Sequence, residues 1–303
     1  MNTTIELDDK HKVSRLGLGC MGMSDFYGQP DDQESTLTIH EAIDNGITFI
    51  DSADFYGAGH NELLVGKAIK SQREKVFLSV KIGPYRIPGG GYSKPNGDPD
   101  YIKSALAYSL VRLGTEYIDL YFPSRIDPDY PIEQQMEALV EMKEKGFIRH
   151  IGLSEVSAAT VRKAHAIHPI KAVQIEYSLW SREPEDELLP TLRELGIPMV
   201  AYSPLSRGFL SGELKSPEDM KDGRRFFPRF QGENFYKNLQ VVEKIKELAR
   251  EKGCTAAQLA IAWVLAQGDD IICLAGTKKR QYLRENIQAL SCLLYTSPSP
   301  RDS

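Results

Sequence analysis

The chain has 303 residues, of which 41% are hydrophobic and 26% charged, proportions that are typical of a soluble globular protein. Its formal net charge of −5 argues against a nucleic acid or an anionic membrane as the main partner. No apolar run approaches the length that spans a bilayer, and the N-terminal residues lack the apolar stretch of a secretory signal. The four cysteines are scattered without metal-binding or disulfide spacing. We therefore expect a cytoplasmic protein with reduced thiols and no metal site.

Eight short runs of apolar and β-branched residues are predicted to form strands. Most of them are almost continuously apolar, which is expected when both faces of a parallel strand are buried. Longer segments with helical periodicity lie between them, and three of these segments have clear start and stop signals. The predicted strands are residues 16–21, 47–53, 76–82, 117–122, 148–154, 172–178, 198–204 and 271–277. The three helices are residues 31–46, 98–114 and 255–268, the last with Thr255 as its N-cap.

Eight strand–helix units in a chain of 303 residues predict an α/β fold, a single-domain (β/α)₈ TIM barrel over residues 1–290. A doubly wound parallel sheet is the alternative arrangement of the same units. Residues 83–99, after the third strand, and residues 206–234, after the seventh, are too long for simple connections. Loops of this length in a compact fold usually cover or line a binding site, so we expect them to do so here.

Residues 17–22, GLGCMG, fit the glycine pattern of a dinucleotide-binding turn. That pattern binds a dinucleotide only when a helix opens directly on its glycines. Here the segment MSDFYGQPDDQ, which contains Gly28 and Pro30, precedes any helical periodicity. We therefore reject a Rossmann domain and expect the glycines to allow a close backbone approach at the mouth of the first strand.

In a barrel of this kind, the functional side chains stand where strands end and the following loops begin. Asp51, Tyr56 and Lys81 occupy such positions after the second and third strands. Each alone has an ordinary structural explanation, but a buried lysine at the end of an apolar strand needs a partner, and Asp51 is available. The later strand ends add Ser124, Ser154, Glu155, Gln174, Tyr202 and Ser203.

Asp51, Tyr56 and Lys81 together permit one particular chemistry. A tyrosine hydroxyl has an ordinary pKa of about 10 and is a poor acid or base at neutral pH. A nearby ammonium favours the ionised form and is expected to lower that pKa, while a carboxylate holds the ammonium in place. The tyrosine can then give a proton to a carbonyl oxygen as hydride reaches the carbon. Hydride transfer of this kind requires a nicotinamide coenzyme.

The segment AGTKKRQYLREN is a candidate site for the far end of such a coenzyme. Thr277 and Lys278 are placed to meet a phosphate, with Lys279, Arg280 and Arg284 nearby. Several cations together favour the additional 2′-phosphate of NADP over NAD. A solvated basic start of a helix explains the same residues equally well.

These residues, in this order, resemble the aldo-keto reductase superfamily. The matching segments are GLGCMGMS, FIDSADFYG, VFLSVKIG, YIDLY, IRHIGLSE, AVQIEYSLWSR, VAYSPLSRGFLSG, PRFQGENF and GTKKRQYLREN. They extend from about residue 16 to about residue 290, nearly the whole chain. The resemblance implies a (β/α)₈ barrel that prefers NADP and reduces small aldehydes and ketones.

The resemblance also implies roles for individual residues. Tyr56 would be the proton donor, tuned by Asp51 and Lys81. The implied coenzyme-facing set is Gly19, Met21, Gly22 and Asp51 at the first two strand mouths, Ser154 and Gln174 at the carboxamide, Tyr202 on the nicotinamide ring, Ser203, Leu205, Arg207 and Gly208 at the pyrophosphate, and Gly276, Thr277, Lys278, Glu285 and Asn286 at the adenosine phosphate and base.

The chain departs from the family pattern at one catalytic position. After DLY the family usually has a histidine followed by arginine, and this histidine is the fourth member of its catalytic tetrad. This chain has Ser124 followed by Arg125. Serine can donate a hydrogen bond but is shorter, so we expect contact with the carbonyl oxygen through a bridging water. Loss of one such donor costs on the order of 10²–10³ in rate in well-studied enzymes, so we count Ser124 as a catalytic residue of a slower or differently specialised reductase.

The second departure is the ending, CLLYTSPSPRDS. The family normally continues into a closing helix and a loop that shapes the substrate pocket. This Ser/Pro-rich ending resembles a reading frame through a sequencing-library adapter, and a natural disordered terminus is the alternative. We expect residues 291–303 to be an unstructured tail and the C-terminal end of the barrel to be truncated.

The leading functional hypothesis is an NADPH-dependent reductase of a small-molecule carbonyl compound, with no nucleic-acid or membrane partner. The alternative is a subunit that binds NADPH as a sensor or regulator and reduces little, which the missing histidine suggests. The intact set of Asp51, Tyr56 and Lys81 favours the enzyme. The sequence identifies neither the substrate nor the oligomeric state.

Overall fold

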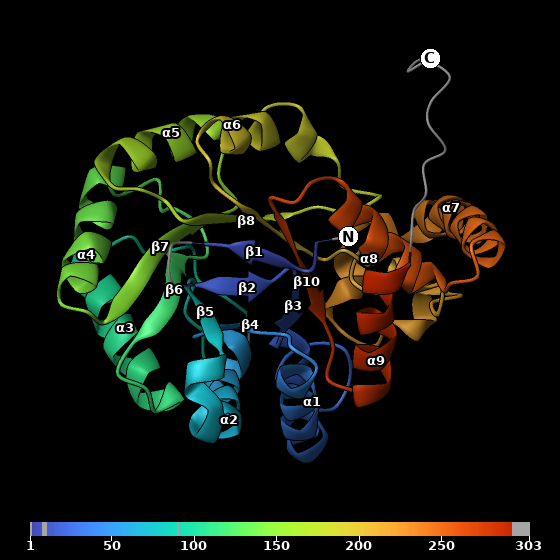
Figure 1. Cartoon of the computed structure of the whole chain (residues 1–303), viewed down its shortest axis with the longest axis horizontal. Helices are drawn as coiled ribbons and strands as arrows, with labels where there is room; N and C mark the ends of the chain where they lie inside the picture. The colour runs from blue at the N-terminus through green and yellow to red at the C-terminus, as the bar shows by residue number, and fades with distance from the viewer. Residues whose placement is uncertain (1, 8–10, 90, 293–303) are drawn as a thin grey trace.

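The computed structural model describes residues 2–7, 11–89 and 91–292 of the chain. Its centre is a closed barrel of parallel strands in the order β10-β3-β4-β5-β6-β7-β8-β9 (Figure 1). β10 pairs with β3, with Gly276 opposite Gly19, and this pairing closes the barrel. The predicted (β/α)₈ barrel is confirmed, and the doubly wound alternative is wrong because an open sheet has two free edges. The strands are β3 (Leu16–Gly19), β4 (Phe49–Ala53), β5 (Phe77–Ile82), β6 (Ile118–Pro123), β7 (Ile148–Ser154), β8 (Ala172–Glu176), β9 (Met199–Tyr202) and β10 (Ile271–Gly276).

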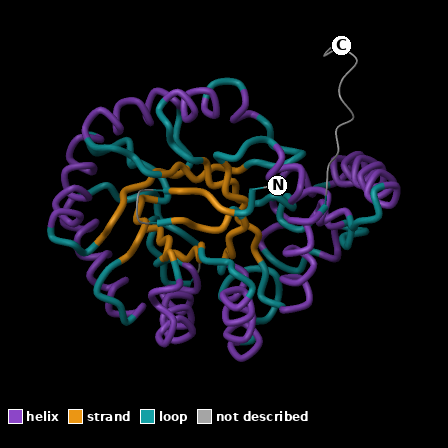
Figure 2. Tube along the Cα trace, in the orientation of Figure 1, coloured by secondary structure: helices purple, strands orange, loops and turns teal. Residues whose placement is uncertain are grey.

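Helices surround the barrel, as Figure 2 shows. Asp98 caps α3, and Gly114 ends this helix with a left-handed φ of 62°. Thr255 is the N-cap of α8, as predicted, and forms a capping box with Gln258. Among the described residues, every helix is too short or too polar to cross a bilayer. The helices are α1 (Asp32–Asp44), α2 (His60–Ile69), α3 (Pro99–Leu113), α4 (Ile132–Glu144), α5 (Ala158–Ile167), α6 (Leu188–Glu194), α7 (Gly232–Glu251), α8 (Ala256–Ala266) and α9 (Arg280–Gln288).

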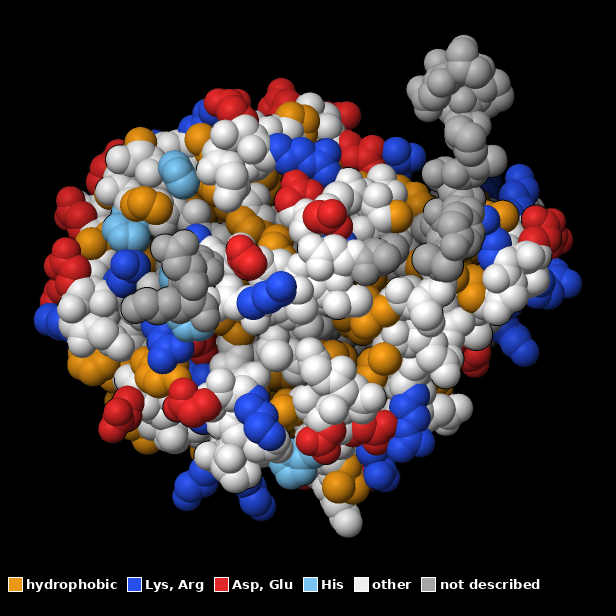
Figure 3. Space-filling model, in the orientation of Figure 1, with side chains coloured by type: hydrophobic (Ala, Val, Ile, Leu, Met, Phe, Trp, Pro, Cys, Tyr) orange, Lys and Arg blue, Asp and Glu red, His pale blue; other side chains and the backbone are white. Residues whose placement is uncertain are grey.

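A hairpin that the sequence did not reveal lies across the amino-terminal end of the barrel (Figure 1). β1 (Thr4–Glu6) pairs antiparallel with β2 (Lys12–Ser14). Leu7 and Val13 are buried in one cluster with barrel residues such as Phe49. On this face, basic and acidic side chains are interspersed (Figure 3). The functional side chains of such a barrel are expected at the opposite mouth, where the strands end.

Aromatic side chains pack in both long loops predicted from the sequence, and the loop after β9 also contains short 3₁₀ turns. The loop after β5 doubles back through a bridge between Arg86 and Tyr92. The loop after β9 packs on a buried cluster that includes Phe209, Phe230 and Phe235. The 3₁₀ turns are η1 (Met21–Met23), η2 (Tyr56–Gly59), η3 (Lys70–Lys75), η4 (Glu183–Glu185), η5 (Phe209–Ser211), η6 (Pro217–Asp219), η7 (Gly223–Phe226), η8 (Pro228–Phe230) and η9 (Ala289–Ser291).

The last of these turns, η9, lies at the predicted boundary between barrel and tail. It ends at Ser291, one residue beyond the predicted end of the domain at Leu290. Residues 293–303 of the predicted tail lie outside the described residues.

Candidate active site

Asp51 and Lys81 meet at the carboxyl ends of neighbouring strands. Asp51 lies in β4 and Lys81 in β5, where the parallel register places Lys81 opposite Ala53. The Lys81 ammonium donates a hydrogen bond to one carboxylate oxygen of Asp51. The other oxygen accepts from the Ser79 hydroxyl at 2.9 Å and from the Gln174 amide at 3.0 Å. The predicted partnership of Asp51 and Lys81 is confirmed, and three donors hold the carboxylate in the barrel mouth.

Tyr56 begins the turn after β4 and lies against this ion pair. Its side chain is buried, and the Lys81 ammonium is 5.2 Å from the centroid of its ring. Burial raises the pKa of Tyr56 well above its ordinary value, and the negative charge of Asp51 adds to the rise. The expected lowering of this pKa is therefore wrong, because desolvation of the phenolate outweighs an ammonium whose charge Asp51 already balances. Tyr56 is consequently protonated at neutral pH, as a proton donor must be.

Ser124 follows β6 directly and lies beside the turn that carries Tyr56. Its backbone N–H donates to the carbonyl of Ile82. Gly83 lies between Ser124 and Phe55: a Cβ built on Gly83 would come within 2.8 Å of Ser124 Cβ and 2.7 Å of Phe55 Cε1. Ser124 is therefore at the predicted strand end and shares the barrel mouth with Phe55, the chain neighbour of Tyr56.

The ends of β7, β8 and β9 bring Ser154, Gln174 and Tyr202 to the same mouth. Ser154 is opposite Gln174, and Tyr202 is opposite Glu176. Glu155, the residue after Ser154, has a left-handed φ of 54° and accepts a hydrogen bond from the Glu176 N–H at 3.2 Å. Burial, with the charge of Glu155 and its hydrogen bond, raises the pKa of Tyr202. The predicted coenzyme-binding residues did not include Glu155. Its position directly after the end of β7 is the sequence feature that could have indicated it.

The turn after β9 has an unusual backbone. Ser203, Ser206 and Arg207 have left-handed φ values of 55°, 45° and 58°, and Gly208 has a φ of 90°. Non-glycine residues in this region store strain, which is found at ligand-binding turns. Leu205 anchors the turn against the core. Arg207 Nε is buried and has no hydrogen-bond partner in the part of the chain that the structure describes. The unpaired Nε of Arg207 on this strained turn fits a diphosphate, whose oxygens are strong acceptors.

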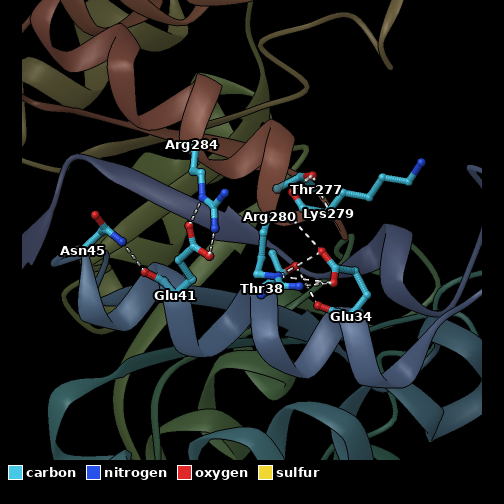
Figure 4. Close-up of polar contacts among 8 residues, drawn as sticks. All are labelled: Glu34, Thr38, Glu41, Asn45, Thr277, Lys279, Arg280 and Arg284. Atoms are coloured by element: carbon cyan, nitrogen blue, oxygen red, sulfur yellow. Dashed lines mark hydrogen bonds and ion pairs between the residues drawn. The ribbon is translucent and has the colours of Figure 1, made fainter.

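Two arginines of α9 that were predicted near a phosphate are instead bound to α1. Arg280 pairs with Glu34 at 3.0 Å, and Arg284 pairs with Glu41, each through two guanidinium nitrogens. Figure 4 shows both pairs, with the Lys279 side chain extending away from them. Arg280 and Arg284 therefore join two helices, and contact of this basic segment with a phosphate stays a prediction. Their partners could not be seen in the sequence because α1 and α9 become neighbours only when β10 closes against β3.

Lys278 extends to the loop before α1. Its ammonium donates to two backbone carbonyls of the loop before α1, at 2.7 and 3.1 Å, and burial lowers its pKa. The Thr277 hydroxyl accepts from the backbone N–H two residues on, at 3.2 Å. Glu285 accepts from the Thr255 hydroxyl at 2.6 Å, and Asn286 is buried. Glu285 is thus already engaged by the N-cap of α8.

The glycine pattern near the first strand opens no helix. Met21 and Gly22 lie in the short turn η1, and α1 begins only at Asp32, so the rejection of a Rossmann domain is confirmed. Gly19 lies beside Gly276, and a Cβ on Gly19 would be 3.4 Å from Gly276 Cα. This pair of glycines leaves the strand mouth free of side chains.

A closed parallel barrel with a buried ion pair and a buried tyrosine at its mouth is typical of enzymes of the (β/α)₈ class. A model of the aldo/keto reductase family matches residues 15–298. The chain therefore belongs to the aldo/keto reductase family of oxidoreductases.

Curated proteins and solved structures agree with this membership. The chain is 47% identical over 288 residues to the probable aldo-keto reductase 1 of Glycine max, covering 93% of this chain and 82% of that protein. It is 46% identical over 289 residues to the aldo-keto reductase yakc [NADP(+)] of Schizosaccharomyces pombe, covering 93% and 85%. The glycerol dehydrogenase AKR11B4 of Gluconobacter oxydans superposes with a TM-score of 0.83 at 30% identity, covering 98% and 97%. An aldo/keto reductase of Klebsiella pneumoniae in complex with NADP and acetate superposes with a TM-score of 0.77 at 26% identity, covering 98% and 92%.

Proposed function

We propose that the protein reduces small aldehydes or ketones with NADPH, with Tyr56 as the proton donor. The observation that carries this proposal is the contact of a buried, protonated Tyr56 with the Lys81–Asp51 ion pair. The names of the relatives support the coenzyme, since one from Schizosaccharomyces pombe is designated for NADP(+) and one from Klebsiella pneumoniae was solved with NADP.

The residues at the barrel mouth fit an extended dinucleotide. The strained turn of Ser203, Leu205, Arg207 and Gly208 would hold the diphosphate through backbone N–H groups and the free Arg207 nitrogen. The other residues proposed to hold the coenzyme are Gly19, Met21 and Gly22 at the first strand mouth, Ser154, Gln174 and Tyr202 at the nicotinamide, and Gly276, Thr277, Lys278, Glu285 and Asn286 at the adenosine end. When bound, NADPH supplies the hydride.

In this proposal the proton that reaches the carbonyl oxygen comes from a side chain of the protein. The Tyr56 hydroxyl donates its proton to the carbonyl oxygen of the substrate. The Lys81 ammonium, 5.2 Å from the ring centroid, stabilises the negative charge that develops on the phenol oxygen. Asp51 holds the Lys81 side chain in place through their ion pair. Ser124, directly or through a water, donates a second hydrogen bond to the same carbonyl oxygen.

The test is oxidation of NADPH followed with a panel of aldehydes, ketones and quinones. We expect turnover with at least one of them, and turnover that depends on Tyr56. A panel that gives no turnover, with coenzyme binding intact, would contradict the proposal.

A second candidate function is an NADPH-binding sensor or regulatory subunit with little turnover. Ser124 in place of the usual histidine is the observation that favours it. Calorimetry would then give tight NADPH binding, while steady-state reduction would be negligible with every carbonyl compound.

Location in the cytoplasm stays a prediction of the sequence.

A further inference from the structure

The two backbone groups that flank Tyr56 are bound by one ion pair. The N–H of Gly57 donates to Asp25 Oδ2 at 2.6 Å. The carbonyl of Phe55 accepts from Arg86 Nε at 3.1 Å. Arg86 Nη2 in turn pairs with the other oxygen of Asp25. The chain is therefore held immediately before and immediately after the proposed proton donor.

The turn that carries Tyr56 needs such support. Gly57, Ala58 and Gly59 have left-handed φ values of 56°, 54° and 93°. A left-handed alanine costs on the order of 1–3 kcal/mol and persists only where the surroundings fix it. A Cβ on Gly57 would come within 2.9 Å of Ser24 Cβ, so the turn is pressed against the segment that carries Asp25.

A further buried residue fixes the far end of this turn. The Asn61 amide donates to the Cys20 carbonyl and to the Ser24 hydroxyl, each at 2.8 Å, and its oxygen accepts from Ser52. At the Tyr56 end, the Asp25–Arg86 pair attaches the turn through side-chain hydrogen bonds. Its side chains are 15% and 28% exposed, so the pair is only partly screened by water.

Arg86 also connects the Tyr56 turn to the loop after β5. The Arg86 guanidinium lies 4.3 Å from the centroid of the Tyr92 ring, and Tyr92 packs edge-on against Phe55 at 6.0 Å. The same loop exposes Tyr85 and Ile87 to solvent. This loop is therefore attached, through one guanidinium, to the backbone carbonyl of Phe55, the residue directly before Tyr56.

We propose that Asp25 and Arg86 are positioning residues for Tyr56, and that they couple the loop of Tyr85, Ile87 and Tyr92 to the proton donor. This proposal rests on the proposed function, because it takes Tyr56 as the donor. A purely structural ion pair would change the stability of the chain and leave the chemical step unaffected. Positioning residues change the chemical step, because small displacements of a donor cost rate steeply.

Hydrogen–deuterium exchange of the coenzyme-free protein tests the attachment directly. The peptide that contains Gly57 should exchange faster in both Asp25→Ala and Arg86→Ala than in the wild-type chain. In Asp25→Ala the Gly57 N–H loses its acceptor, and in Arg86→Ala that acceptor, Asp25, loses its ion-pair partner. Asp25→Asn retains an oxygen that can accept from Gly57 and should exchange more slowly than Asp25→Ala. Lys94→Ala is the matched control, since its exposed ion pair with Asp129 lies in the same loop without touching the Tyr56 turn. Unchanged exchange in Arg86→Ala and Asp25→Ala would overturn the proposal.

Steady-state kinetics test whether the attachment of the Tyr56 turn affects the chemical step. We expect kcat to fall roughly 10- to 100-fold in Arg86→Ala with little change in KM. The isotope effect on kcat with NADPH deuterated at the transferred position should rise as the chemical step becomes limiting. Arg86→Lys should recover part of the lost kcat, because a lysine can pair with Asp25. It should not recover all of it, because an ammonium lacks the planar guanidinium that binds Asp25 and the Phe55 carbonyl together. Lys94→Ala should keep the wild-type kcat.

The two proposals fail separately. A fully active Tyr56→Phe variant overturns the proposed function. An inactive Tyr56→Phe variant together with a wild-type kcat in Arg86→Ala overturns only the positioning roles of Asp25 and Arg86.

Discussion

Lys81 and Asp51 form an ion pair in which only 4% and 2% of the two side chains are exposed. Removing two charges from water is costly, and it is offset here by the pairing and by the hydrogen bonds that Ser79 and Gln174 give to Asp51. Loss of either partner would leave a buried charge without compensation. The pair is thus a requirement of both the fold and the proposed chemistry.

The first prediction concerns Lys81. In Lys81→Met, Asp51 stays buried without its counter-charge, so we expect the free energy of unfolding to fall by about 3–5 kcal/mol. Asp51→Asn/Lys81→Met should recover part of this stability, because no buried charge remains, while kcat stays low since the ammonium is absent. Urea unfolding and NADPH-oxidation assays measure the two effects. A double variant no more stable than Lys81→Met would contradict the assignment of the loss to an unpaired Asp51.

The second prediction concerns Ser124. If its hydroxyl donates to the carbonyl oxygen, Ser124→Ala should lower kcat/KM by at least about tenfold, and Ser124→His should raise it, because the longer side chain reaches the oxygen without a water. Calorimetric binding of NADPH is the control and should be equal in all three proteins. Equal kcat/KM in wild-type and Ser124→Ala would remove Ser124 from the catalytic set.

A third prediction separates two kinds of cation in the last segment. Lys278→Ala should weaken NADPH binding, measured by fluorescence titration, more than it weakens NADH binding, because a 2′-phosphate loses a cationic partner. Arg284→Ala breaks an exposed pair with Glu41 and should cost at most about 1 kcal/mol of stability with little change in coenzyme affinity. If Arg284→Ala lost more NADPH affinity than Lys278→Ala, Arg284 would have to be counted among the cations that bind the phosphate.

The fourth prediction concerns pH and stability. Asp54 Oδ1 is buried without a hydrogen-bond partner among the described residues, and burial together with the charge of Glu62 raises the pKa of Asp54 to about 7. The folded chain therefore binds this proton more tightly than the unfolded chain, whose aspartate pKa is about 3.9. The free energy of unfolding should fall as pH rises from about 4 to about 7, by at most ~4 kcal/mol from this group.

Asp54→Asn removes this titration and should flatten the decline, with Glu62, whose pKa is also raised by burial, contributing the remainder. Urea unfolding at about pH 5 and about pH 8 compares the two proteins. Equal declines in wild-type and Asp54→Asn would show that Asp54 is not the titrating group.

The barrel itself could be predicted because buried parallel strands are continuous apolar runs. Each predicted strand end lies within two residues of the observed one. The end-of-strand positions also placed Asp51, Lys81 and Ser124 at one mouth. The hairpin of β1 and β2 was missed because three-residue strands carry almost no periodicity.

The remaining errors concern properties that only the folded chain has. The pKa of Tyr56 depends on how completely the ring is desolvated, which residue spacing does not report. The partners of Arg280 and Arg284 are on α1, more than 240 positions away in sequence. Asp25 and Arg86 carry no motif and are brought to Tyr56 by the folding of two loops.

The central claim is that Tyr56 gives the proton to a carbonyl oxygen. Tyr56→Phe keeps the ring against Lys81 and removes only the hydroxyl, so coenzyme affinity and stability serve as internal controls. The decisive measurement is kcat for NADPH oxidation with the best carbonyl compound of the panel, compared between wild-type and Tyr56→Phe. We predict a fall of about 10²–10⁴-fold with an unchanged Kd for NADPH. An equal kcat in the two proteins would contradict the account.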